Sequence, residues 1–143
     1  MMHLLLIFIA SILLTPVQTS KVVGEWVTID DATGREKSVV MLYEENGQLY
    51  GSIQELLLPE DAGKRCVNCK GELKDQPIVG MRIINGLIPE DDSWTSGTIL
   101  DPANGKDYDC TLRLEDDNTL LVRGYIGFSF IGRTQKWVRK TAP

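Results

Sequence analysis

Turn-forming residues interrupt most of the chain after residue 20 at intervals of about ten residues, and no long window shows helical periodicity. In the clearest run, residues 107–115, Tyr108, Cys110, Leu112 and Leu114 alternate with charged or polar residues. The pair Asn46-Gly47 predicts a hairpin turn, because Asn and Gly tolerate positive φ. This spacing predicts an all-β fold.

We predict about eight strands, at residues 22–30, 37–44, 48–57, 78–85, 94–101, 107–115, 119–126 and 130–139. Tight turns join most of them, which is typical of a single antiparallel up-and-down β-barrel. At about eight strands such a barrel closes and can hold one small ligand. A β-sandwich of two sheets is the alternative architecture.

Residues 1–20 have the pattern of a secretory signal peptide. The stretch Leu4–Leu14 is apolar apart from Ser11, is too short to span a bilayer comfortably, and is followed by Pro16. We therefore expect export to the periplasm or out of the cell, with one domain at residues 21–143 and no stable membrane insertion after cleavage. A retained N-terminal anchor is the alternative, since no Lys or Arg precedes the apolar stretch.

The composition excludes several classes of function. The net charge of −5 lies entirely after residue 20 and there is no basic stripe, which argues against nucleic acid as a partner. The one histidine, His3, lies within the predicted signal, so the mature chain lacks the imidazole of a Ser-His-Asp, Cys-His or histidine-ligated metal site. We expect no enzymatic activity, no metal and no cofactor.

The connection Leu58–Pro77 is unusually long for a compact domain, and such connections are commonly lids or binding loops. It contains Cys66 and Cys69, for which a structural disulfide is expected in an oxidising compartment. Redox chemistry and zinc binding remain as alternatives, although each needs features that the sequence does not show. Cys110 lies on the apolar face of its run and is expected to be a buried small hydrophobe.

Several motifs occur in an order and at spacings that together are specific. The chain thereby resembles the family of small exported bacterial proteins filed as DUF2147. The motifs are Gly24-Glu25-Trp26, Gly47-Gln48-Leu49-Tyr50-Gly51, Cys66-Val67-Asn68-Cys69-Lys70-Gly71, Pro77-Ile78-Val79-Gly80-Met81, Gly97 to Asp101, Arg123-Gly124-Tyr125-Ile126-Gly127 and Gly132-Arg133-Thr134-Gln135 with Trp137.

The family is similar to lipocalin-like barrels, and the resemblance implies a role for residues at both chain ends of the domain. In such barrels the tryptophan of a Gly-x-Trp motif closes the bottom, and an arginine near the end of the last strand stacks over it. The residues implied in barrel closure are Gly24, Trp26 and Trp137, with Arg139 as the first choice of arginine and Arg133 as the second.

The resulting hypothesis is a non-enzymatic binder of a small, predominantly apolar, lipid- or fatty-acid-like ligand. The candidate cavity residues are Arg123, Tyr125, Met41, Met81 and Trp94. If Arg123 points inward, a carboxylate head group is favoured. Two other hypotheses remain open: an envelope interaction module that uses the Leu58–Pro77 loop, and a thiol redox protein that uses Cys66 and Cys69.

Overall fold

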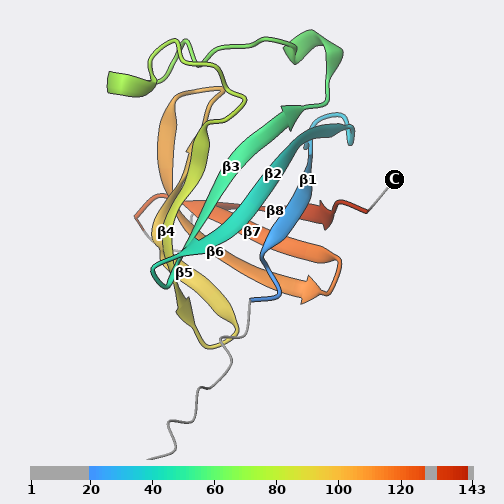
Figure 1. The fold of residues 1–143 in the computed structure, drawn as a ribbon, viewed down its shortest axis with the longest axis vertical. Coiled ribbons are helices and arrows are strands. Elements are labelled where there is room, and N and C mark those ends of the chain that lie inside the picture. The colour runs from blue at the N-terminus through green and yellow to red at the C-terminus, as the bar shows by residue number, and fades with distance from the viewer. Residues whose placement is uncertain (1–19, 128–131, 142–143) are drawn as a thin grey trace, which may run out of the picture.

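Eight strands form one closed antiparallel barrel in the computed structural model, which describes residues 20–127 and 132–141 (Figure 1). Each strand pairs with its sequence neighbours, and β8 returns to pair with β1. The predicted up-and-down barrel is therefore confirmed, and the sandwich alternative is wrong. The strands are β1 (Gly24–Ile29), β2 (Glu36–Glu45), β3 (Gln48–Leu56), β4 (Arg82–Glu90), β5 (Ser93–Asp101), β6 (Lys106–Asp116), β7 (Thr119–Tyr125) and β8 (Gly132–Arg139).

The fourth strand differs from its prediction. We expected it at residues 78–85, which have strand-like character in the sequence; Gly86 and Pro89 are residues that usually interrupt a strand. In the structure β4 begins at Arg82 and continues to Glu90, with Gly86 at a φ of 66° and Pro89 paired with Trp94. Two further predictions fall outside the described residues, namely nearly all of the signal peptide at 1–20 and the first two residues of the last strand.

The strand directions define two ends of the barrel. At the base end lie the segment before β1, the hairpin turns after β2, β4 and β6, and the end of β8. At the other end, residues 57–81 connect β3 to β4 and arch over the barrel (Figure 1). We call these residues the strap; they include two short 3-10 helices, η1 (Pro59–Asp61) and η2 (Gly71–Leu73).

Alternation along the strands directs apolar side chains into the barrel, where many of them are fully buried. The packing is dense around Gly51 in β3. A Cβ placed there would lie 2.8 Å from Leu42 Cδ2, 3.2 Å from Ile84 Cβ and 3.4 Å from Val40 Cγ1. Not even a methyl group fits at this level without displacing a neighbour. Among the residues described, no helix has the length and apolarity needed to cross a membrane.

Candidate functional site

Trp26 and Arg139 close the base end of the barrel. The two residues are register partners in the β1–β8 pair, and the Arg139 guanidinium carbon lies 4.3 Å from the centre of the buried Trp26 ring. Arg139 Nε donates to the carbonyl oxygen of Asp117 at 2.8 Å, and Nη2 donates to that of Lys21 at 2.7 Å. The Trp26 indole donates to the carbonyl oxygen of Val22 at 2.8 Å. The cation–π contact and these hydrogen bonds therefore stabilise the pairing of β8 with β1.

Arg133, the second choice for this role, lies at the opposite end of β8. Its Nη1 forms an ion pair with Asp31 at 3.2 Å, and Gln135 Nε2 donates to the same carboxylate at 3.0 Å. The buried Trp137 indole in turn donates to Gln135 Oε1 at 3.3 Å. These contacts link the barrel wall at β8 to the β1–β2 turn. Hydrogen bonds from the backbone N–H and hydroxyl of Thr33 shape that turn and lower the pKa of Asp30.

The strap is held together by short-range contacts within itself. Cys66 and Cys69 form a disulfide. The Lys74 ammonium donates to the carbonyl oxygen of Val67, Arg65 donates to that of Asp75 at 3.1 Å, and Lys64 pairs with Asp61 at 2.9 Å. The strap therefore has a defined conformation of its own.

The strap docks on the turn between β5 and β6. Asn68 Nδ2 donates to the carbonyl oxygen of Ala103 at 2.8 Å, and Cys66 Sγ lies 3.4 Å from the carbonyl oxygen of Pro102. Gly105, with a φ of 72°, faces the backbone of Asn68 so closely that an added Cβ would overlap the Asn68 carbonyl. Glycine is needed there for both its backbone conformation and its small size.

The disulfide has little access to solvent. Cys66 is 0% exposed and Cys69 is 3% exposed, and both belong to the hydrophobic core. Thiol–disulfide exchange requires a thiolate to reach a sulfur atom, so this burial argues for a structural bridge rather than a redox site. Cys110 is a free thiol inside the barrel, and burial raises its pKa to about 12.

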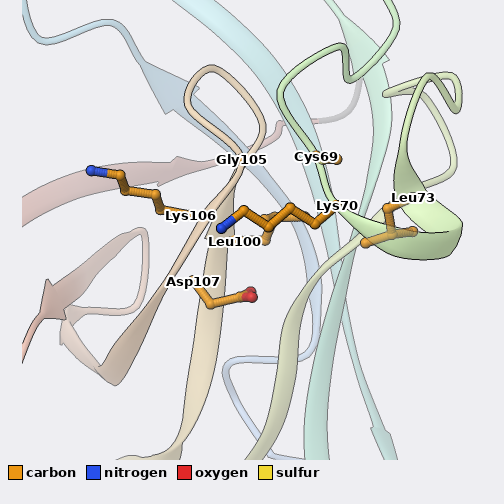
Figure 2. A pocket seen from close by; sticks show the side chains of 7 residues that line it. All are labelled: Cys69, Lys70, Leu73, Leu100, Gly105, Lys106 and Asp107. Atoms are coloured by element: carbon orange, nitrogen blue, oxygen red, sulfur yellow. The ribbon is translucent and has the colours of Figure 1, made fainter.

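A half-open hollow of about 270 Å³ lies between the strap and the β5–β6 turn. We call it the strap hollow; its lining residues are Cys69, Lys70, Leu73, Leu100, Gly105, Lys106 and Asp107. Figure 2 shows Lys70 extending from the strap towards Leu100 and Asp107, whereas Lys106 extends away from them. The hollow thus combines two leucines with a cation and a carboxylate that come from opposite walls.

A second half-open hollow, of about 320 Å³, lies at the base end. Its apolar lining is provided by Val22, Pro89, Trp94 and Leu114, and its polar lining includes Asp91 and Asp92. Among the described residues, no cluster of His, Cys, Asp and Glu has a geometry that could hold a metal ion. Within the same ranges, every buried side-chain nitrogen and oxygen has a hydrogen-bond partner.

The five candidate cavity residues do not come together. Arg123 and Tyr125 alternate with the buried Val122 of β7, and Arg123 Nη1 donates to Thr134 Oγ1 at 3.1 Å. Met41 alternates in the same way with the buried Leu42 of β2. Met81 is buried in the core at the end of the strap, and Trp94 lines the hollow at the base.

Apart from Cys69, which was predicted as a disulfide cysteine, the residues of the strap hollow were not among the predicted site residues. Lys70 and Leu73 follow Cys69 within the long connection Leu58–Pro77, for which a lid or a binding loop was expected, so its length was one available signal. Leu100, Lys106 and Asp107 flank the predicted turn at 102–105 and carried no distinguishing pattern. Their proximity to the strap depends on the docking of Asn68 against Gly105.

The fold is shared with a solved structure. The chain superposes with a TM-score of 0.74 on a solved structure described as "Protein HP1028 from the human pathogen Helicobacter pylori belongs to the lipocalin family". The two chains are 20% identical, and the match covers 86% of this chain and 85% of the other. At this identity the likeness establishes a lipocalin-like fold and nothing about a ligand. No curated protein matches the sequence.

The sequence also matches a family model over the whole barrel. The match covers residues 24–139, from the first residue of β1 to the last residue of β8, and the family is described as "Uncharacterized protein conserved in bacteria (DUF2147)". This match includes all eight strands of the lipocalin-like barrel, the residues that close its base and the strap. The chain therefore belongs to the DUF2147 family.

Proposed function

We propose that this protein is an exported, non-enzymatic binding protein for a small, predominantly apolar molecule that carries an acidic group. The strap hollow is the binding site in this proposal. The observation that carries it is the presence of Leu73, Leu100 and the Lys70 ammonium around one hollow of about 270 Å³. Ligand sites of soluble proteins commonly combine an apolar lining with a few polar groups that fix orientation.

The dense packing around Gly51 favours the strap end over the middle of the barrel as the site. A guest at the level of Gly51 would have to displace side chains that are already in contact, which costs packing energy. At the strap hollow no such displacement is required. The lipocalin-like fold supports a binding role, and the buried disulfide supports export to an oxidising compartment.

Native mass spectrometry of the protein, purified under mild conditions from its own host, tests the proposal. A small acidic molecule should accompany the protein and be lost on denaturation. A Lys70→Met variant should carry less of it, while Arg113→Met, which removes one positive charge from an exposed position of β6, should carry as much as the wild type. Protein without a guest, and without affinity for added short- or medium-chain acids, would refute the proposal.

A second function is favoured by the surface of the strap. Val67, Leu73 and Val79 are 58%, 39% and 47% exposed, so the strap presents three large apolar side chains to solvent. An interaction module of the envelope would use such a surface. Cross-linking from position 67 in living cells distinguishes the two functions, because a small-molecule carrier gives no stable protein adduct there.

A further inference from the structure

We infer that the strap hollow selects a short acid with about nine non-hydrogen atoms and a hydrogen-bond donor close to its carboxylate. This inference rests on the proposed function and specifies the class of ligand. It follows from three properties of the hollow: its volume, the cation that the strap directs into it, and the carboxylate on the opposite wall.

The volume indicates how much of a ligand the half-open hollow can enclose. Water occupies about 30 Å³ per molecule in the liquid, so a hollow of about 270 Å³ holds about nine water molecules or a similar number of packed non-hydrogen atoms. A long-chain fatty acid would extend well outside it. An acid with a chain of about six carbons would place its apolar part against Leu73 and Leu100.

Of the cationic side chains of the strap, Lys70 is the one whose charge is available to a ligand. Lys64, Arg65 and Lys74 each bind an oxygen atom within the strap, which accounts for their positions. Lys70 forms no ion pair with any described carboxylate and extends across the hollow (Figure 2). An exposed ammonium without an ion-pair partner, at the edge of a hollow that also contains leucine side chains, can attract a carboxylate.

Asp107 adds the second requirement. Its carboxylate lines the same hollow from β6, and among the described residues it has neither an ion-pair partner nor a side-chain hydrogen bond. An ionised carboxylate can only accept hydrogen bonds, and it repels an acid that offers no donor. A hydroxyl or amide N–H next to the ligand's carboxylate would satisfy Asp107 while the carboxylate itself binds Lys70.

Titration of the oxidised mature chain with three probes, followed by NMR at the Leu100 and Gly105 amides, tests this inference. The probes are 3-hydroxyhexanoate, hexanoate and hexanol, which share a six-carbon chain. The hydroxy acid should bind about tenfold more tightly than hexanoate, as expected for one hydrogen bond to a charged acceptor. Hexanol should bind most weakly, because it lacks the carboxylate.

Two variants test whether Lys70 and Asp107 produce the preference for the hydroxy acid. Lys70→Met should weaken both acids about tenfold and leave hexanol unchanged, and Asp107→Ala should abolish the preference for the hydroxy acid. Both side chains are exposed, so the variants should keep the wild-type unfolding midpoint. Arg113→Met serves as the control for net charge.

The outcomes separate the inference from the proposed function. Equal binding of the two acids, or a preference that survives Asp107→Ala, would overturn the inference while hexanoate binding still supports an acid-binding hollow. If neither acid shifts the Leu100 and Gly105 resonances, both the inference and the proposed site are wrong. Loss of the preference in Asp107→Ala, with hexanoate binding retained, would support both.

Discussion

The two ends of the barrel are closed in different ways. At the base, Trp26 and Arg139 come from the first and last strands, and their contact exists only when the barrel has closed. At the other end the strap is organised by contacts between residues that are close in sequence, such as Cys66 with Cys69 and Lys74 with Val67. The base closure is therefore part of global folding. Although Ile78 and Met81 of the strap reach the barrel core, we expect the strap to loosen more readily than the barrel opens.

This comparison predicts the largest effect at the base. Trp26→Ala should lower the free energy of unfolding by about 4 kcal/mol, because a fully buried indole is lost and Arg139 loses the ring beneath it. Urea denaturation followed by circular dichroism measures the change. Val67→Ala on the strap is the control and should change stability by less than about 0.5 kcal/mol. A loss below about 1 kcal/mol for Trp26→Ala would contradict the role assigned to the base closure.

A pair of glycine substitutions tests how the strap is docked. Gly47 and Gly105 have φ values of 78° and 72°, so alanine is strained by a similar amount, about 1 kcal/mol, at both positions. Only at Gly105 does the added Cβ overlap the Asn68 backbone, which should raise the total cost to about 3 kcal/mol.

Hydrogen exchange shows which backbone amides lose protection in Gly105→Ala. Amides of the strap should lose protection in Gly105→Ala and keep it in Gly47→Ala. Equal stability of the two variants would mean that the contact between Gly105 and Asn68 is not what positions the strap.

Removing the disulfide should have a smaller and local effect. The bridge closes a ring with a sequence separation of 3, for which the chain-entropy relation gives about 2 kcal/mol. A Cys66→Ala, Cys69→Ala double variant should expose strap amides to exchange, while those of β1 and β8 remain protected. A uniform loss of protection over the whole barrel would show that the strap and the base form a single cooperative unit.

The smallest predicted effect concerns the buried thiol of Cys110. Its pKa is about 12 in the folded protein and about 8.5 in an unfolded chain, so above pH 8.5 only the unfolded state releases the proton. The stability that this thiol contributes is complete below pH 8.5 and falls as the pH rises towards 12. At pH 9.5 the loss should be about 1.4 kcal/mol relative to pH 7.

Cys110→Ala isolates this contribution from that of other groups that titrate at alkaline pH. The difference between wild type and variant, taken from urea unfolding at both pH values, should shrink by the same amount. The change should appear in global unfolding and not in exchange of the strap, because Cys110 lies within the barrel core. An unchanged difference would mean that the thiol reaches water in the folded state.

Most of the architecture could be predicted from local sequence patterns. Alternation in residues 107–115 and turn pairs such as Asn46-Gly47 determine strands and hairpins within a few residues, so seven of the eight strands were close to their expected positions. The fourth was displaced, because Pro89 pairs with Trp94 of β5 and Gly86 adopts a φ of 66° within the strand rather than ending it. That outcome depends on pairing across the sheet, which no local pattern encodes.

The proposed binding site was less predictable for the same reason. The strap was identified as a loop with binding potential, and Cys66 and Cys69 were expected to form the disulfide that the structure contains. Of the cavity candidates, however, Met41, Met81 and Trp94 were chosen by residue type, and Arg123 and Tyr125 by an alternation that does not say which face points inward. Met41 and Arg123 alternate with buried side chains, and the barrel directs these two away from the interior.

The sequence by itself determined the number of strands, their order and the chemistry available to the chain, because these depend on periodicity and composition. Only the tertiary structure decided which side chains meet. Docking of the strap on the β5–β6 turn brings Lys70 and Asp107 to one hollow, whereas the stacking of Arg139 over Trp26 was already expected from the family resemblance. Contacts between residues so far apart in the chain arise from packing of the whole molecule, and local sequence patterns do not predict them.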